Sequence, residues 1–242
     1  MLTAAFWGFV AGAALIVGAV IGVYVRTSTR VIGLIMAFGS GVLISALAFE
    51  LTHEAYLRGG GTAAIVGLAA GSLTFFVGDW FVDRHGGDRR KSPTGRQAGA
   101  GAMALVLGSL LDGIPESIAI GVSLLGGGAV GIAVVVAVFL SNVPESLSAS
   151  AGMQAAGRSK TYIMGLWAAV LAVSTVSSAL GYGLLGGSPD WLIAGIQTFA
   201  AGAILTMLAD TMLPEAVEHA GQVVGLATVV GFSAAFLLSM AG

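Results

Sequence analysis

Cysteine is absent from this sequence and charged residues are scarce, and each of these features excludes a class of protein. Without cysteine the chain forms neither disulfide bonds nor thiolate metal sites. Charged residues make up 9% of the 242 positions, whereas soluble domains carry about 25%. The net charge of −2 gives no reason to expect a nucleic-acid partner. A hydrophobic fraction of 57% and a mean hydropathy of +0.96 instead indicate an integral membrane protein in contact with lipid.

Apolar runs of about 20 to 27 residues are separated by Arg, Gly-Gly or Pro-Asp breaks, and each run is long enough to cross a bilayer as a helix. We therefore expect an all-α membrane protein with a single transmembrane domain over residues 1–242. The polar segment 83–97 is rich in Arg and Gly, which predicts a mobile loop. The eight expected helices cover about 4–25, 31–57, 62–82, 98–124, 129–155, 160–186, 190–219 and 221–241.

Basic residues gather on one side of this expected topology. Only Arg58 falls on the other side, so the positive-inside rule places the basic side, with the loop 83–97, in the cytoplasm. Both termini are then extracytoplasmic, and we expect the plasma (inner) membrane of a bacterium. The nine residues on the basic side are Arg26, Arg30, Arg84, Arg89, Arg90, Lys91, Arg96, Arg158 and Lys160.

Two internal repeats predict a symmetric arrangement of the helices. The stretches GSLLDGIPESIAIG (108–121) and AVFLSNVPESLSAS (137–150) share Pro-Glu-Ser, on neighbouring spans of opposite direction. Residues 41–60 also align with residues 202–221, again on spans of opposite direction. A 3+2+3 arrangement with inverted repeats accounts for both, and such repeats are typical of transporters with a site near the midplane. For the second pair, similar Gly, Ala and Leu composition is the alternative explanation.

Polar side chains fall on one face of each central span. Asp112 and Glu116 are four residues apart on span 98–124, as are Ser141 and Glu145 on span 129–155. Asn142 precedes Glu145 by three residues, and both spacings place side chains next to each other on a helix. If the two spans are antiparallel neighbours, Asp112, Glu116, Asn142 and Glu145 form one site of three carboxylates and an amide.

Prolines stand next to these acids, at Pro115 and Pro144. A proline inside a helix removes an amide donor and displaces the carbonyl four residues earlier, here that of Leu111 or Leu140. In lipid a freed carbonyl needs a partner, so such positions face protein, water or an ion. We therefore expect both central spans to be kinked where the acids lie.

The acids are costly in a membrane, at about 2.5–3.5 kcal/mol each at the bilayer centre. Every basic residue lies in a loop or at a span end, so we expect none to neutralise these acids. The carboxyl groups are then either protonated or bound to a cation, and a divalent metal ion suits carboxylate and amide oxygens. Two alternatives stay open: acids that only hydrogen-bond between helices, and a proton-linked carrier or channel for another small solute.

Further polar residues mark the two ends of a path through the membrane. They are expected to be relay ligands at its outer and inner mouths, or else solvated helix ends. An enzyme is not expected, because HEAY (53–56) lacks the second His of a zinc protease motif. The candidates are Glu50, His53 and Glu54 on the outer side, Asp210, Glu215, Glu218 and His219 on the inner side, and Ser141 beside the central site.

These features resemble the ZIP (Zrt-, Irt-like) family of divalent metal transporters, in its bacterial type. The family motif in the fourth span reads roughly His-Asn-x-Pro-Glu-Gly, where this chain has DGIPES (112–117). A similar motif in the fifth span corresponds to SNVPES (141–146). The resemblance covers nearly the whole chain, including the eight spans, the outer termini and the polar cytoplasmic loop.

The resemblance implies uptake of Zn²⁺, or of Fe²⁺, Mn²⁺ or Cd²⁺, toward the cytoplasm, with Asp112, Glu116, Asn142 and Glu145 as ligands and no prosthetic group. It also implies a homodimer and an elevator-like motion of spans 1, 4, 5 and 6 against spans 2, 3, 7 and 8. Asp112 departs from the family's His, which makes the ligand set harder and less selective for Zn²⁺. No acid occurs in span 160–186, so we expect one metal site rather than two.

Overall fold

The computed structural model describes residues 1–87, 89–95, 102–126 and 132–241, and its regular structure within these ranges is helical, without strands. The expectation of an all-α protein is therefore confirmed. Among the described residues, six helical segments are long and apolar enough to cross a membrane, which indicates an integral membrane protein. They are Leu2–Tyr24, Thr29–Gly87, Met103–Ser123, Ile132–Ala155, Lys160–Leu185 and Asp190–Met240.

Helices α1, α4, α5 and α6 begin and end within a few residues of the expected positions, whereas the expected helices 31–57 and 190–219 are each divided by a π-helical segment. Ser28 and Ser159 cap α2 and α6 by accepting hydrogen bonds from backbone amides of the first turn. Residues 98–101 and 129–131 of the expected helices lie outside the described residues. The helices are α1 (Leu2–Tyr24), α2 (Thr29–Ala46), α3 (Glu54–Val82), α4 (Ala102–Ser123), α5 (Ile132–Ala155), α6 (Lys160–Leu185), α7 (Asp190–Met207), α8 (Leu213–Ala220) and α9 (Val224–Ala241). Short π-helical segments η1 (Leu47–His53), η2 (Asp83–Gly87) and η5 (Leu208–Met212) and 3₁₀ turns η4 (Leu124–Gly126) and η6 (Gly221–Val223) join them.

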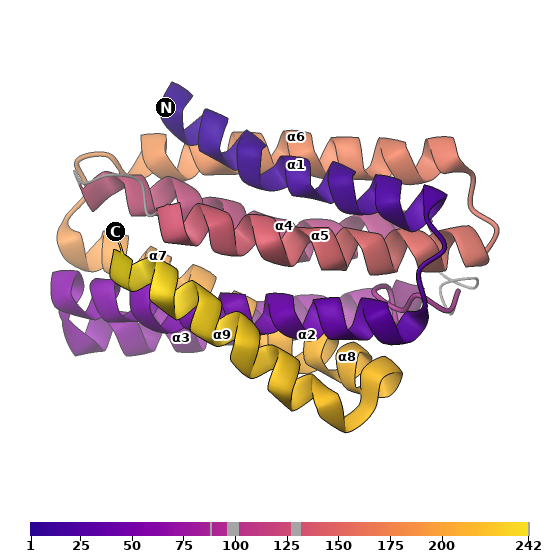
Figure 1. Ribbon diagram of the computed structural model, residues 1–242. Helices are drawn as coiled ribbons and strands as arrows, with labels where there is room; N and C mark the ends of the chain where they lie inside the picture. The colour runs from indigo at the N-terminus through magenta and orange to yellow at the C-terminus, as the bar shows by residue number, and fades with distance from the viewer. Residues whose placement is uncertain (88, 96–101, 127–131, 242) are drawn as a thin grey trace.

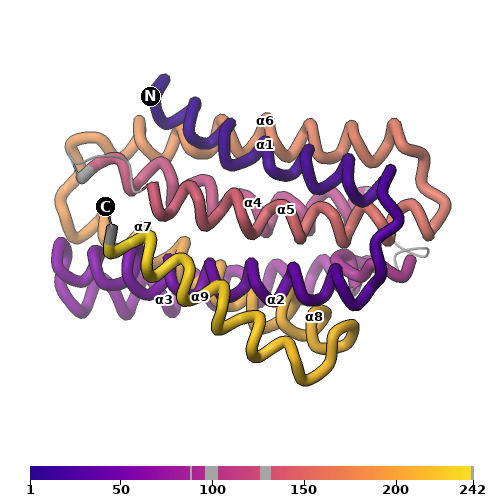
Figure 2. Tube along the Cα trace, viewed as in Figure 1, coloured from indigo at the N-terminus to yellow at the C-terminus, as the bar shows by residue number. Residues whose placement is uncertain are grey.

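The helices lie in two layers, as Figure 1 shows. One layer contains α1, α4, α5 and α6, and the other contains α2, α3, α7, α8 and α9. The layers meet where α5 packs against α2 and where α4 packs against α7. Both chain ends lie toward the same end of the bundle, as the trace in Figure 2 shows.

The two long segments 29–87 and 190–240 each contain a glycine with a left-handed backbone. Gly60 has φ of 82° and Gly221 has φ of 68°, a conformation that favours glycine because a side chain would be strained there. In each segment a π-helical stretch precedes this glycine, beginning at Leu47 and at Leu208. These four positions are equivalent in the alignment of 41–60 with 202–221, so both the turn and the π-helical stretch recur.

Glycines at equivalent positions also bring the helix backbones together. A Cβ atom built on Gly41 of α2 would lie 1.9 Å from a carbonyl oxygen of α9, and one on Gly202 of α7 would lie 2.1 Å from a carbonyl oxygen of α3. Reciprocal approaches occur at Gly71 of α3, at 1.9 Å from α7, and at Gly231 of α9, at 2.0 Å from α2. The pairs α2–α9 and α7–α3 therefore pack in the same way, which composition alone does not require.

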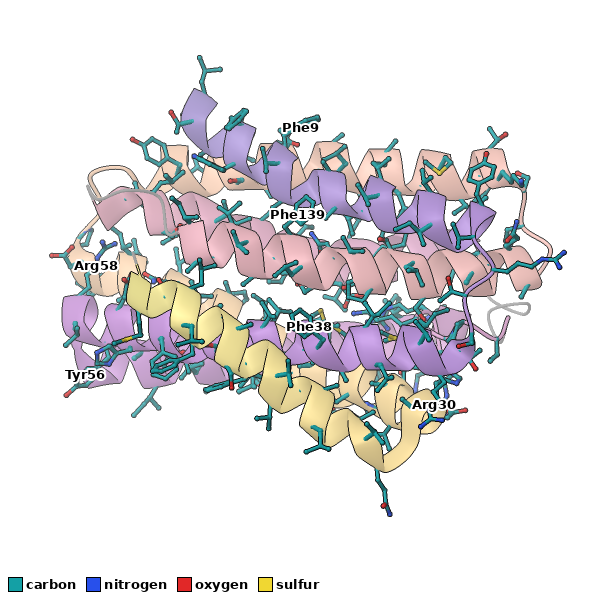
Figure 3. The ribbon with its side chains drawn as sticks, in the orientation of Figure 1. Phe9, Arg30, Phe38, Tyr56, Arg58 and Phe139 are labelled. Atoms are coloured by element: carbon teal, nitrogen blue, oxygen red, sulfur yellow. The ribbon has the colours of Figure 1, made fainter. Side chains whose placement is uncertain are left out.

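Arg30 and Arg58 lie at opposite ends of the bundle, as labelled in Figure 3. This separation matches the expected placement of Arg58 apart from the other basic residues. Helices α4 and α5 remain helical through Pro115 and Pro144, and the kinks expected there stay a prediction. The prolines thus leave the helices continuous rather than divided.

Candidate cation site

The acids expected at the centre of the molecule are buried between α4 and α5 and their neighbours. Asp112 and Glu116 on α4 are 2% and 1% exposed, and Glu145 on α5 is 3% exposed. Glu116 is within electrostatic range of both Glu145 and Asp112. The structure therefore gathers the three carboxyl groups that helical spacing predicted to meet.

Lys91 lies among these acids, although it belongs to the polar segment between α3 and α4. Its Nζ is 3.3 Å from Oδ2 of Asp112 and 3.3 Å from Oε2 of Glu145, and the lysine side chain is 2% exposed. The expectation that no basic side chain would neutralise the acids is therefore wrong. Hydropathy assigned Lys91 to a solvated loop, whereas the charge of the acids holds it inside the protein.

Arg90 makes a second set of ion pairs beside Lys91. Its guanidinium donates from Nε and Nη2 to the Asp112 carboxylate, at 3.2 and 3.1 Å, and approaches Asp79 of α3 to 2.6 Å. Asp83 lies 3.7 Å away on the more exposed side. Burial acts to lower the pKa of Arg90, but Asp112 and Asp79 together raise it above its ordinary value. The guanidinium therefore stays charged inside the protein.

Contacts with α4 and α5 hold the segment 89–93 against the helices. The Ser148 hydroxyl on α5 donates to the carbonyl oxygen of Lys91. A Cβ atom on Gly108 would lie 2.4 Å from Cδ of Arg90, so the missing side chain at this glycine makes room for the arginine. Ser92 and Pro93 are buried as well. The expected mobile loop is therefore wrong for residues 90–93, which fold back against the helices.

Several buried polar atoms of the site lack hydrogen bonds among the described residues. These atoms are Oε1 of Glu116, Oε2 of Glu145 and Nζ of Lys91. The Lys91 contacts are thus ion pairs without good hydrogen-bond geometry. Buried polar groups in proteins are nearly always hydrogen-bonded, and unsatisfied ones are commonly found at functional sites. The centre of the molecule is therefore a strongly charged cluster whose polar groups are only partly satisfied.

The other two central candidates make contacts within the helices. The Asn142 side chain donates from Nδ2 to the carbonyl oxygen of Ala11 on α1, at 3.2 Å. Ser141 donates to the carbonyl oxygen of Val138, one turn earlier on α5, at 3.0 Å. Both side chains are buried, and both donors are satisfied by backbone oxygens.

The inner candidates on α8 form a separate cluster around Arg89. Nη1 of Arg89 lies 2.6 Å from Glu218 and 3.3 Å from Glu215, and His219 lies 3.2 Å from Glu215. The hydrogen bond to Glu215 raises the pKa of Arg89. A cavity of about 260 Å³ joins the two clusters, with Arg89, Arg90, Lys91 and Asp210 in its wall. The inner candidates Asp210 and Glu215 thus share this cavity with Arg90 and Lys91, the two cations of the central cluster.

The outer candidates lie apart from this cavity, near the junction of η1 and α3. Glu50 accepts a hydrogen bond from the Ser239 hydroxyl of α9. His53 and Glu54 are exposed, and His53 lines a mostly apolar hollow with Tyr56. These residues remain candidates for an outer mouth, without a contact to the central acids in the described part of the chain.

Sequence reasoning missed the part of Asp79, Arg90 and Lys91 in the central cluster of ion pairs. Asp79, near the end of α3, is buried and pairs with Arg90. A charge imbalance in the sequence could have indicated these contacts. The acids within the expected spans had no counter-ions, and three consecutive basic residues, Arg-Arg-Lys, lie in the adjoining polar segment.

The described residues do not form a ready-made metal site. Within 1–87, 89–95, 102–126 and 132–241, no three His, Asp or Glu side chains are positioned to hold a metal ion. The acids surround an ammonium group instead, at ion-pair distances. Neither a protein-family model nor a curated protein matches this chain.

Proposed function

We propose that this protein is a membrane carrier for divalent metal cations, of the kind found in the ZIP family, with eight spans and uptake toward the cytoplasm. The observation that carries the proposal is the buried cluster of Asp112, Glu116 and Glu145, which already holds a cationic group between two helices. Intramembrane acids around a cation are typical of ion pathways rather than of purely structural helices.

The charge of the cluster fits a divalent substrate. Asp79, Asp112, Glu116 and Glu145 are four buried carboxyl groups, and Arg90 and Lys91 are two buried cations. When all are ionised, two negative charges remain uncompensated. This excess of negative charge attracts a divalent cation, and oxygen ligands suit Mn²⁺, Fe²⁺ or Zn²⁺.

Metal binding would require the acids to approach each other. Oxygen ligands lie about 2.0–2.6 Å from a bound divalent metal, which is shorter than the 3.3 Å between Lys91 Nζ and the oxygens of Asp112 and Glu145. The arrangement around Lys91 therefore corresponds to a metal-free state in this proposal. Asn142 could bind the metal only after breaking its hydrogen bond to the carbonyl oxygen of Ala11.

The turns inside the two longest segments support an eight-span topology. If Gly60 and Gly221 each divide their segment, 29–87 or 190–240, into two crossings, the chain has eight crossings in a 3+2+3 order. The recurring π-helical stretches and glycine contacts support an inverted repeat of the first and last three spans. In this topology both termini face outward, and the positive-inside rule places Arg30 on the cytoplasmic side.

Metal uptake by proteoliposomes tests the proposal. Vesicles containing the native chain should accumulate at least one of Zn²⁺, Cd²⁺, Mn²⁺ and Fe²⁺, and Glu116→Gln and Glu145→Gln should abolish this uptake. Asp190→Asn is the matched control, because Asp190 is an exposed acid at the start of α7. Absence of uptake for all four ions would contradict metal transport.

The same vesicles test the origin of the ion preference. Asp112→His introduces the histidine that the ZIP-family motif has at this position. Histidine nitrogen favours Zn²⁺ more than a carboxylate oxygen does. We expect the ratio of Zn²⁺ to Mn²⁺ uptake to rise in this variant. An unchanged ratio would show that Asp112 does not select the ion.

A proton-linked carrier for another small solute is the second candidate. The observation that favours it is Glu116, a buried carboxyl group with an oxygen that lacks a hydrogen-bond partner among the described residues. Two protons would neutralise the cluster with Arg90 and Lys91 in place. A pH-sensitive dye inside metal-free vesicles separates the candidates, since only this second function gives Glu116-dependent proton flux without any metal.

A further inference from the structure

We propose that the basic triplet, Arg89–Arg90–Lys91, is a built-in substitute for the transported cation. It occupies the site when no metal is bound, and metal entry displaces it. The inference rests on the proposed metal transport and adds a competitor within the same chain. Its basis is the position of the triplet: Arg90 and Lys91 enter the central cluster of acids, and Arg89 enters the adjoining cluster on α8, all from a segment outside the spans.

Lys91 takes the place that a metal ion would take. Its single ammonium group lies at equal distance, 3.3 Å, from carboxylates of α4 and α5. A metal ion bridging Asp112 and Glu145 would need the same space, because both would have to contact the same two oxygens. Metal and lysine therefore cannot occupy the site together.

The lysine is also poorly held by hydrogen bonds, which makes its displacement feasible. Its Nζ has no hydrogen-bond partner among the described residues, so the ion pairs alone hold the ammonium in place. A divalent ion interacts with the same carboxylates through twice the charge at shorter range. Its entry would thus replace a partly satisfied contact with a stronger one.

Each member of the triplet contacts a different set of helices. Arg89 pairs with Glu218 of α8, Arg90 links Asp79 of α3 to the acids of α4, and Lys91 links α4 to α5. Because α3 and α8 belong to one layer and α4 and α5 to the other, the triplet holds the two layers together (Figure 1). Displacement of the triplet would therefore remove ion pairs between the layers and permit them to move.

The triplet also reduces the uncompensated negative charge of the site when no metal is bound. With Arg90 and Lys91 in place, two of the four buried carboxylates are neutralised without any metal. The substitute enters from the loop side of the bundle, so it closes that side of the site while the metal is absent. Leakage of ions through an unloaded carrier is thereby reduced.

Hydrogen–deuterium exchange of the segment 89–95 tests the inference without metal. Two amides of this segment are hydrogen-bonded, those of Arg90 and Ser92, and their exchange reports whether the segment is docked. In purified full-length protein, Lys91→Met and Asp112→Asn should each speed this exchange about tenfold or more. Arg84→Met is the control, because Arg84 is exposed in the same polar segment and stacks on Trp80.

Exchange at the native rate in both cluster variants would overturn the inference, whatever the outcome of any transport assay. Lys91→Arg adds a second check, since it keeps the charge and should preserve most of the protection. Protection lost equally in Lys91→Arg and Lys91→Met would show that packing, not charge, docks the segment.

Metal titration tests the competition itself. Thermal stabilisation by Mn²⁺ or Zn²⁺ should occur at about tenfold lower concentration in Lys91→Met than in the native chain, because the competitor is gone. In the native chain the same metal should speed exchange of 89–95. Metal that stabilises the native chain without changing this exchange would refute the competition.

The two proposals fail in distinguishable ways. If no metal stabilises either the native chain or Lys91→Met, metal transport fails and the competition fails with it, even where the metal-free exchange shows a docked triplet. If metal stabilises both chains at equal concentration, metal binding stands and the triplet is refuted as its competitor.

Discussion

Replacing Lys91 by methionine should strongly destabilise the protein in the absence of metal. Methionine keeps the length of the side chain but removes the charge, so Asp112 and Glu145 would face each other across a site that is 2–5% exposed. Removing one partner of a buried ion pair costs about 3–5 kcal/mol, since the remaining charge stays buried and uncompensated. Asp112 keeps Arg90, so most of this cost should come from Glu145.

A double-mutant cycle with Glu145→Gln isolates the pair. Glutamine removes the charge that Lys91 compensates, so the double variant should recover part of the loss, with a coupling energy of about 0.5–3 kcal/mol. The free energy of unfolding is measured in mixed micelles with increasing denaturing detergent, without metal and with a chelator. Arg89→Met is the comparison, because its 43% exposed side chain should contribute only about 0–1 kcal/mol.

Two results would refute this reasoning. The first is a Lys91→Met chain as stable as the native one, which would mean that the carboxyl groups are protonated and need no counter-ion. The second is zero coupling in the cycle, which would mean that Lys91 stabilises the protein by packing alone. Saturating divalent metal should restore stability to Lys91→Met if metal and lysine share one site.

Three further predictions follow from packing and hydrogen bonds. Gly108→Ala should displace Arg90, whose Cδ would lie 2.4 Å from the new Cβ, and should cost about 1–3 kcal/mol, whereas Gly113→Ala on the same helix meets its nearest atom only at 3.4 Å and should be mild. Gly71→Ala should separate α3 from α7 because its Cβ would lie 1.9 Å from a backbone oxygen, which lowers the unfolding temperature far more than Gly165→Ala does. Asn142→Ala should cost about 0.5–1.5 kcal/mol, measured by the same detergent unfolding, because the hydrogen bond to the α1 backbone is lost.

The helices could be predicted from the sequence because the signals are long and local. Apolar runs and their breaks place the ends of several helices within a few residues, as for α6, expected at 160–186 and found at Lys160–Leu185. The ends of α2 and α7, at Ala46 and Met207, lie well before the expected 57 and 219. The π-helical stretch after Ala46 could not be predicted, because its pattern of apolar residues is the same as that of an α-helix. The continuity of α5 through Pro144 also depends on neighbouring helices rather than on the proline alone.

The central site could be predicted only in part. Helical spacing brought Asp112 and Glu116 to one face, because residues four apart are neighbours on a single helix. The pairing of Lys91 with Glu145 joins a polar segment to a helix far along the chain, and no periodic pattern encodes such a contact. Hydropathy also counts Arg90 as a residue that prefers water, although carboxylates in a low-dielectric interior attract it strongly.

Charge compensation across the whole chain, rather than within each helix, decides what the central acids can bind. A lysine tethered by a short segment is present at its site at an effective concentration of roughly millimolar. A metal ion at lower concentration therefore displaces Lys91 only if the carboxylates prefer the divalent ion by a matching factor. Asp112 contributes to both sides of this balance, because it contacts Arg90 and Lys91 and is also a proposed metal ligand. In the proposed function its carboxylate therefore sets the metal concentration at which the carrier loads, and a histidine at this position would weaken the hold on the two basic residues as well as change the ion preference.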